Sequence, residues 1–421
     1  MGIFPRKSAF SRVTQLAARR QVHAAFAWLH THGQKIMQWQ SELCEIPAPP
    51  FGEEARSAWI AQRLRAMGVS DAHTDELGNV LGTVPARNLP AGSSGPVVVL
   101  SAHLDTVFPA EVELRPKVEH VDGGTRLSVP GACDNGAGVA GLLAIAQCLL
   151  EGEIELAAPL LLLANVGEEG EGDLRGVRHF YQQRALAGRV AAHIALDGAG
   201  ADTAVTQALG SQRFKVTVFG PGGHSFTDAG TPNPIAALAA ALNSLAGVSL
   251  PEVPRTTCNI GTIHGGTSVN SIPESATASV DFRSTSTAEL LRLEVALHRA
   301  VEDAVIQANS RAELVRNKGL LRFEVTTIGD RPTGELPLDS ALLEALRAVD
   351  RHLGIRTELR LGSTDANIPI AMGIPALSIG AGGEGGGAHT LAEWFCDKDR
   401  EHGLRRVLLL TLLMTEWASE Q

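Results

Sequence analysis

Short, almost uninterrupted apolar runs alternate along the chain with longer stretches whose apolar positions recur at helical spacing. The runs are VVVLSAH at 97–103, PLLLLANV at 159–166, VAAHIALD at 190–197 and IPALSIGAG at 374–382. Runs of this kind are typical of parallel strands that are buried on both faces. Together with helical segments such as 136–150, they predict an α/β domain with a mostly parallel sheet and helices on both faces.

At the start of the chain, the spacing of apolar residues predicts one helix over 13–44 and another over 52–67 that ends at Gly68. A Pro-rich loop, IPAPPFG, separates the two helices. Such a loop interrupts a helix because proline cannot donate a backbone hydrogen bond.

Between about residues 209 and 329 the pattern changes. Strand-like and helical segments follow in the order 212–219, 233–246, 254–264, 276–283, 287–309 and 320–328. This β-α-β-β-α-β order predicts a small ferredoxin-like sandwich inserted into the larger domain. The larger domain is therefore expected in two parts, 1–208 and 330–421, with 209–329 between them.

Composition narrows the class of protein. The chain has 421 residues, of which 44% are hydrophobic and 19% charged, with a net charge of −10. These fractions are those of a globular protein. The acidic balance argues against nucleic acid or an anionic membrane as the partner. The apolar runs fall short of the ~20 residues that span a bilayer, so we expect no membrane association.

The cysteines indicate the compartment. There are five, and they lack the CxxC spacing of a structural zinc site. A disulfide framework is not expected, which favours a reducing compartment and a cytoplasmic protein.

Histidines and carboxylates gather where the predicted strands end. They are His103 at the end of the first run, Glu168 and Glu169 after the second, Asp197 at the end of the third, and His389 after the fourth. Ligand sites in open α/β sheets lie at this edge, and Asp134, just before a helix, is placed to join them. Such a cluster would be unfavourable without a cation. Imidazoles with carboxylates suit Zn²⁺, with Mn²⁺ or Co²⁺ as alternatives.

Spacing within this set indicates separate roles. His103 and Asp105 are two residues apart, so on a continuing strand Asp105 would accept the second ring N–H of His103. Glu168 and Glu169 are adjacent and must diverge, so one can bind metal while the other acts as a base.

Each of these residues, taken singly, has a simpler interpretation as a cap or a solvated charge. The ordered set is what predicts a site. Gly136, Gly138 and Gly141 spell GxGxxG, but no buried strand precedes them, so a dinucleotide site is not predicted. HExxH, GxSxG and P-loop motifs are absent from the sequence.

The motifs HLD, CDNGAG, GEEG, LDG, GSTDAN and AHT, in this order, resemble those of the M20 family of dinuclear zinc peptidases and deacylases. That family includes peptidase T-like tripeptidases, dipeptidases, carboxypeptidases and aminoacylases. The resemblance runs from about residue 35 onward. It implies that 209–329 is a lid domain, through which a homodimer is expected.

The resemblance also implies a ligand set for two divalent metal ions. One ion would be held by His103, Asp134 and Asp197. The other would be held by Asp134, Glu169 and His389, so that Asp134 bridges the two.

Further roles follow from the same resemblance. Glu168 would be the general base for a water that both metals activate, and His224 in GPGGHSFTDAG would stabilise the oxyanion. Asn270 and Arg283 would grip the backbone or carboxylate of the substrate. Two alternatives remain open: His224 is an ordinary turn residue, or Arg283 only pairs with Asp281.

Within the family, Asp rather than Glu at position 197 is associated with aminopeptidases and dipeptidases. The expected enzyme is therefore a metallopeptidase that hydrolyses short peptides. A deacylase of N-acyl amino acids is the alternative. A catalytically dead binding protein is disfavoured, because every metal position and Glu168 are intact. The N-terminal extension 1–34 departs from the tripeptidase pattern and has no functional account.

Overall fold

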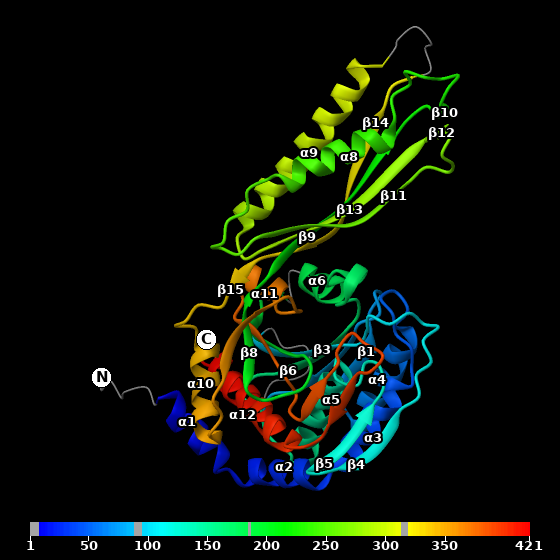
Figure 1. The fold of residues 1–421 in the computed structure, drawn as a ribbon. Coiled ribbons are helices and arrows are strands. Elements are labelled where there is room, and N and C mark those ends of the chain that lie inside the picture. Colours follow the sequence, from blue (N-terminus) through cyan, green and yellow to red (C-terminus); the bar gives the residue numbers. More distant parts are fainter. Residues whose placement is uncertain (1–7, 88–94, 184–186, 313–318) are drawn as a thin grey trace, which may run out of the picture. The chain divides into compact units, whose positions relative to one another are not determined.

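The computed structural model describes residues 8–87, 95–183, 187–312 and 319–421. The chain divides into two compact units. We call Met1–Ala208 with Glu335–Gln421 the first unit, and Leu209–Gly334 the second unit (Figure 1).

A sheet of nine described strands forms the centre of the first unit, in the order β1-β2-β6-β3-β7-β17-β8-β15, with β16 paired to β8. The strands are β1 (Ser70–Thr74), β2 (Val80–Val84), β3 (Val97–His103), β6 (Leu160–Asn165), β7 (Val190–Leu196), β8 (Thr203–Ala208), β15 (Gly334–Glu335), β16 (Glu358–Gly362) and β17 (Ala376–Ile379). The central strands β6, β3, β7 and β17 are parallel. Antiparallel partners flank them, β2 next to β6 and β8 next to β17. The predicted, mostly parallel α/β sheet is confirmed.

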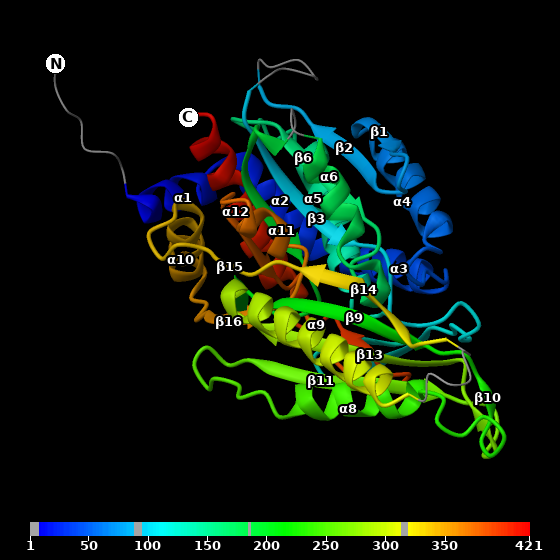
Figure 2. The ribbon, with the colours of Figure 1, turned by 90° about the horizontal axis from the view of Figure 1, so that it is seen from above.

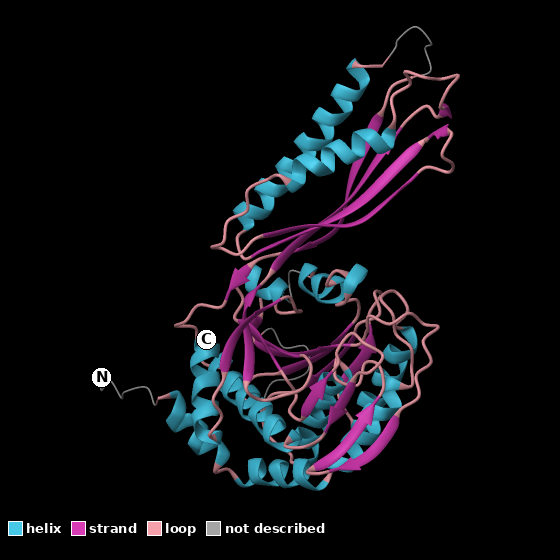
Figure 3. Ribbon diagram, in the orientation of Figure 1, coloured by secondary structure: helices cyan, strands magenta, loops and turns pink. Residues whose placement is uncertain are grey.

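Helices cover both faces of this sheet (Figure 3). Val98 and Leu100 of β3 belong to the same apolar cluster as α5 (Gly136–Glu151) and α12 (Arg400–Ala418). Val97 and Val99 pack instead with α6 (Arg175–Gln182) and α11 (Asn367–Ala371). Because successive strand residues face opposite sides, β3 is buried on both faces, which explains its continuous apolar run. Among the described helices, none has the length and apolar character that a bilayer span requires.

The single helix predicted over 13–44 is wrong. The chain forms α1 (Ala9–Ala17), α2 (Arg20–Thr31) and α3 (Gly33–Cys44), followed by α4 (Glu54–Met67). Arg19 has extended backbone angles and breaks the first helix. The second helix ends just before His32, whose ring Nδ1 lies 2.9 Å from the carbonyl oxygen of Trp28.

The N-terminal helices pack on the rest of the first unit. The α1 helix packs against α10 (Ala341–Leu353) and α12, and α2 packs against α5 and α12. Arg12 and Arg19 both pair with Glu416 of α12, at 3.3 and 2.5 Å. Apolar side chains of residues 8–34, such as Leu16 and Leu29, therefore belong to the core of the first unit. Residues 1–7 of the expected extension lie outside the described residues.

A small antiparallel sheet that the sequence did not predict also belongs to the first unit. Its order is β18-β19-β5-β4. The strands are β4 (Lys117–Val121), β5 (Gly124–Ser128), β18 (Glu384–Gly386) and β19 (Trp394–Cys396). The loop between β18 and β19 carries His389, and the chain after β5 leads to Asp134. This sheet thus brings together two segments that are far apart in the sequence.

The second unit has a four-stranded antiparallel sheet in the order β11-β13-β9-β14, covered on one face by α8 and α9 (Figure 2). In chain order its elements are β9 (Gly210–Phe219), β10 (Gly223–His224), α8 (Pro234–Ala246), β11 (Thr257–Gly265), β12 (Ser271–Ile272), β13 (Ser275–Ser284), α9 (Thr287–Ser310) and β14 (Arg322–Arg331). Without the two-residue strands this is the predicted β-α-β-β-α-β order. The unit ends at Gly334 rather than at residue 329, because β14 continues to Arg331.

Candidate metal centre

The ends of the parallel strands bring the predicted ligands together. His103 is the last residue of β3, Glu169 follows β6, and Asp197 follows β7. Asp134 comes just before α5, and His389 lies between β18 and β19.

The carboxylate of Asp134 lies between the two histidines. Nε2 of His103 is 3.1 Å from Asp134 Oδ1 and 3.9 Å from Asp197 Oδ1. Nε2 of His389 is 3.0 Å from Asp134 Oδ2 and 2.8 Å from Glu169 Oε1. Each imidazole therefore faces a different oxygen of one carboxylate and has a second carboxylate beside it. All five residues named as ligands from the sequence meet in this cluster.

The cluster has the chemistry of a divalent-metal site. Ligand atoms of His103, Asp134 and Glu169 all lie within 4.8 Å of one another. Oδ1 of Asp134 is buried and accepts no well-aligned hydrogen bond from the described residues, although Nε2 of His103 lies 3.1 Å away. A buried carboxylate oxygen whose bonding capacity is unfilled is costly unless a cation satisfies it. Imidazole and carboxylate are the ligands that Zn²⁺ and related ions take.

The electrostatics of the cluster also favour a cation. Hydrogen bonds to Asp134 and Glu169 raise the pKa of His389 to about 10. Burial alone would lower the pKa of His103, but the neighbouring carboxylates, Asp105 first among them, raise it well above its usual value. Burial opposes ionisation of Asp134, yet the two imidazoles lower its pKa. The carboxylates thus stabilise positive charge where a divalent cation would supply it.

Asp105 is placed differently from the sequence expectation. The β3 strand ends at His103, so the chain turns before Asp105. Nδ1 of His103 is 3.1 Å from the backbone carbonyl oxygen of Asp105 and 3.6 Å from its carboxylate Oδ1. The carboxylate accepts the backbone N–H groups of Glu168 and Glu169, at 2.9 and 2.7 Å. Asp105 therefore faces the ring mainly through its carbonyl group and holds the loop after β6 with its side chain.

Sequence reasoning missed Asn135, a buried residue that holds the backbone on both sides of the proposed ligand Asp197. Its Nδ2 donates to the carbonyl of Leu196 at 2.9 Å, and its Oδ1 accepts the N–H of Gly198 at 3.0 Å. These two backbone groups flank Asp197. Oδ1 also accepts the N–H of Gly138 and caps α5. The signal was present in the sequence, because Asn directly before a helical stretch is a preferred N-cap.

Glu393 was also missed. This carboxylate is 1% exposed. Its Oε2 accepts the N–H of Gly131 at 2.8 Å, and its Oε1 accepts the N–H groups of Cys133 and Asp134, both at 2.7 Å. The sequence offered no signal for this role, since a glutamate in a loop is usually solvated.

The second unit brings two of its three predicted residues together. His224 on β10 pairs with Ser271 on β12, and the carbonyl of Asn270 accepts the N–H of Ser225 at 3.0 Å. Arg283 lies at the other end of β13, where its Nε donates to Asp281 at 2.8 Å. The pairing of Arg283 with Asp281 is the alternative left open above.

His224 has a defined tautomer. Its Nδ1 accepts the backbone N–H groups of Phe226 and Thr227, at 3.2 and 3.4 Å. An accepting Nδ1 carries no proton, so the neutral ring bears its proton on Nε2. The side chain is exposed.

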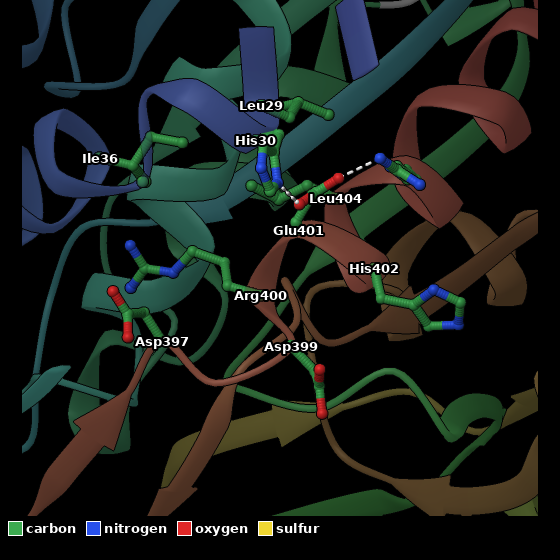
Figure 4. A pocket seen from close by; sticks show the side chains of 11 residues that line it. Leu29, His30, Ile36, Asp397, Asp399, Arg400, Glu401, His402 and Leu404 are labelled. Carbon is green, nitrogen blue, oxygen red and sulfur yellow. Dashed lines mark hydrogen bonds and ion pairs between the residues drawn. The ribbon is translucent and has the colours of Figure 1, made fainter. Parts of the chain in front are cut away.

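A pocket of about 400 Å³ lies elsewhere in the first unit, between α2, α3 and the start of α12 (Figure 4). Nδ1 of His30 bonds to Glu401 at 2.7 Å on its wall. The lining mixes carboxylates with arginines and includes none of the predicted site residues. It is therefore distinct from the metal cluster.

Comparison with known proteins assigns the family. The sequence profile of peptidase family M20/M25/M40 matches residues 99–412. The chain belongs to this family, and the resemblance noted from its motifs is confirmed.

Two curated relatives carry different functional names. An IAA-amino acid hydrolase, ILR1-like 4, of Arabidopsis thaliana is 25% identical over 285 residues, which are 65% of this chain and 62% of that protein. Thermostable carboxypeptidase 2 of Saccharolobus solfataricus is 26% identical over 253 residues, 57% of this chain and 61% of the relative. The chain thus spans about three fifths of the length of these relatives.

Solved structures share the fold over nearly the whole chain. A tripeptidase from Staphylococcus aureus covers 92% of this chain and 99% of its own, with a TM-score of 0.70 and 23% identity. Human carnosine dipeptidase 1 covers 94% of this chain and 99% of its own, with a TM-score of 0.64 and 16% identity.

Proposed function

We propose that the protein is a metal-dependent hydrolase of peptide bonds in short peptides. The observation that carries this proposal is the Asp134 carboxylate, which offers one oxygen toward His103 and the other toward His389. A carboxylate with ligands on both sides could hold two metal ions close together, as they lie in two-metal hydrolytic sites. Membership of a peptidase family supports the reaction class.

Two ions would share the cluster, and we propose Zn²⁺ for both. His103, Asp134 and Asp197 would hold one ion, and Asp134, Glu169 and His389 the other. The short distances from each imidazole to its two carboxylates support this division. Mn²⁺ or Co²⁺ could replace Zn²⁺, since all three accept these ligands.

Divalent cations bound there would lower the pKa of a water and polarise the scissile carbonyl. Glu168 would take the proton of the attacking water and pass it to the leaving amine. Its backbone is fixed by Asp105, and its side chain is buried, which suits a positioned base. His224, with its proton on Nε2, would donate to the oxyanion. Asn270, next to the His224 loop, would bind the substrate backbone.

A second candidate is hydrolysis of N-acyl amino acids. It is favoured by one observation, the relative named IAA-amino acid hydrolase. Both reactions break an amide bond, so the metal cluster and Glu168 would serve either one.

Metal analysis and a substrate panel test the proposal. The Zn²⁺-supplemented protein should carry two ions per chain and should hydrolyse di- and tripeptides with free N-termini. Preference for N-acetylated amino acids would move the assignment to the deacylase. Metal binding below one ion per chain would contradict both candidates and support a binding protein.

The oligomeric state and the cellular location of the enzyme are also part of the proposal. We propose a homodimer through the second unit, where the edge strand β11 exposes Ile260 and Ile263. Sedimentation analysis should give twice the chain mass. A cytoplasmic location is supported by the five free cysteines, which fit a reducing compartment.

A further inference from the structure

We propose that Glu393 is a positioning residue that fixes Asp134 relative to His389 and so sets the metal position these two ligands share with Glu169. The inference rests on the proposed function, because it concerns the same metal site. Glu393 itself is not a ligand in this assignment.

The contacts of Glu393 converge on the loop that carries Asp134. Both carboxylate oxygens are used, one by Gly131 and the other by Cys133 and Asp134. Three N–H groups on one buried carboxylate define the path of a loop more tightly than a single contact does, because hydrogen bonds to a charged group are shorter and stronger. The backbone adds a fourth contact, from the N–H of Val129 to the carbonyl of Glu393 at 3.1 Å.

The same residue is tied to the loop that carries His389. The N–H of Glu393 donates to the carbonyl of Thr390 at 3.1 Å. Thr390 in turn donates its N–H and its hydroxyl to the carbonyl of Gly387, at 3.0 and 2.7 Å. His389 has a φ of 63°, a left-handed conformation that surrounding contacts must maintain in a residue with a side chain. Glu393 thus links the two ligand loops directly.

A second set of contacts holds the Asp134 loop at Ala132, which is not a proposed metal ligand. Nε2 of Gln40 donates to the carbonyl of Ala132 at 2.5 Å, and Arg400 donates to Gln40. Arg400, which also lines the pocket in Figure 4, stacks over Phe395. Gln40 and Arg400 thus anchor the loop at Ala132, whereas Glu393 binds the backbone N–H of Asp134 itself.

Glu393 is 1% exposed, so both of its acceptor oxygens face groups of the protein rather than solvent. A buried carboxylate that binds three backbone N–H groups fits a positional role, in which its two oxygens orient the loop of Asp134 toward His389.

The test is a Co²⁺ titration of the metal-free full chain, followed by calorimetry and visible absorption. The wild type should bind two ions. His389→Ala should bind only one ion, and the absorption band that this variant lacks then belongs to the ion that His389 holds. Glu393→Gln should weaken binding of that same ion roughly 10- to 100-fold, and binding of the other ion by less than about threefold.

The matched control is Glu384→Gln. Glu384 is an exposed carboxylate on the same small sheet, where its side chain pairs with Lys398. The Glu384→Gln variant should bind both ions as tightly as the wild type does. Wild-type binding by Glu393→Gln, or equal weakening of both ions, overturns the proposal.

If Glu393→Gln does not fold, Glu393→Asp carries the test with the same expectation, because its shorter side chain withdraws both oxygens from the three N–H groups. Wild-type binding of both ions by that variant overturns the proposal. If the wild type binds no ion, the proposed function fails and this inference fails with it.

Discussion

The carboxylate of Asp105 accepts the backbone N–H of Glu169 at 2.7 Å. Its other oxygen accepts the N–H of Glu168 at 2.9 Å, and its backbone carbonyl faces the ring of His103. One buried residue therefore fixes the backbone of the proposed base, Glu168, and of one proposed ligand, Glu169, and its carbonyl group faces the ring of a second proposed ligand, His103. Asp105 is not itself a proposed ligand.

Asp105→Asn should lower kcat/KM by roughly 10- to 100-fold with little change in metal content. The amide keeps one acceptor oxygen but presents an NH₂ group to one of the two N–H groups that Asp105 now binds. Steady-state kinetics with metal analysis measures the effect. Asp339→Asn, an exposed control, should match the wild type. Unchanged kinetics in Asp105→Asn would show that the loop does not depend on this contact.

Glu168→Gln should lower kcat by roughly 10²- to 10⁴-fold, because the amide cannot take a proton from water. The metal content should stay at the wild-type value, since Glu168 is not a proposed ligand. The control is Glu171→Gln, an exposed glutamate in the same loop. Full activity of metal-loaded Glu168→Gln would exclude Glu168 as the base.

Removal of metal with a chelator should abolish hydrolysis and lower the melting temperature. A ligand that binds only the folded state, present at about 100 times its Kd, stabilises that state by about 2.7 kcal/mol. Calorimetry before and after Zn²⁺ is restored checks both effects. His103→Ala should not regain either of them. A melting temperature that does not respond to the chelator would contradict the metal assignment.

Asn270→Ala should reduce kcat/KM for a tripeptide more than Arg283→Ala does. From Ser275 to Arg283 the β13 strand spans ~26 Å at ~3.3 Å per residue, so a short substrate cannot reach both ends. Arg283 is also engaged by Asp281. A larger loss in Arg283→Ala would place the substrate at the other end of β13.

Asp365 should make stability depend on pH. Burial raises the pKa of this carboxyl from 3.8 to about 7. The folded chain therefore binds more protons than the unfolded chain between these two values, so Asp365 lowers the free energy of unfolding as pH rises through this window. Above it, the contribution is constant.

Urea unfolding of the wild type and of Asp365→Asn at several pH values tests this expectation. The stability of the variant relative to the wild type should increase from pH 4 to pH 7 and then level off. Parallel pH profiles for the two proteins would show that Asp365 does not titrate in this range.

Much of the candidate site was predictable because a parallel sheet gathers its strand ends. Asp134 and His389 are 255 residues apart in sequence, yet they lie 3.0 Å apart in the structure. Their residue types were enough to predict that they meet, together with the place of His389 after an apolar run and of Asp134 just before a helix.

Glu393 and Asn135 could not be found in this way, because they act on backbone groups. Every residue has a backbone N–H and C=O, so the sequence does not mark which ones a distant side chain will bind. The break between α1 and α2 was hidden for a related reason. It depends on how the helices pack against α5, α10 and α12, whereas helical spacing in the sequence reports only which face is apolar.

The second unit joins the first at two neighbouring points, since β8 and β15 are paired and the N–H of Leu336 donates to the carbonyl of Thr206 at 2.8 Å. Paired strands lie only ~4.8 Å apart, so a short linker from Ala208 to Glu335 would close the first unit into a continuous chain. All five proposed metal ligands would remain in that shortened protein, and His224 would be gone. If His224 has its proposed role, the shortened protein should still bind the metal ions but should not hydrolyse a substrate.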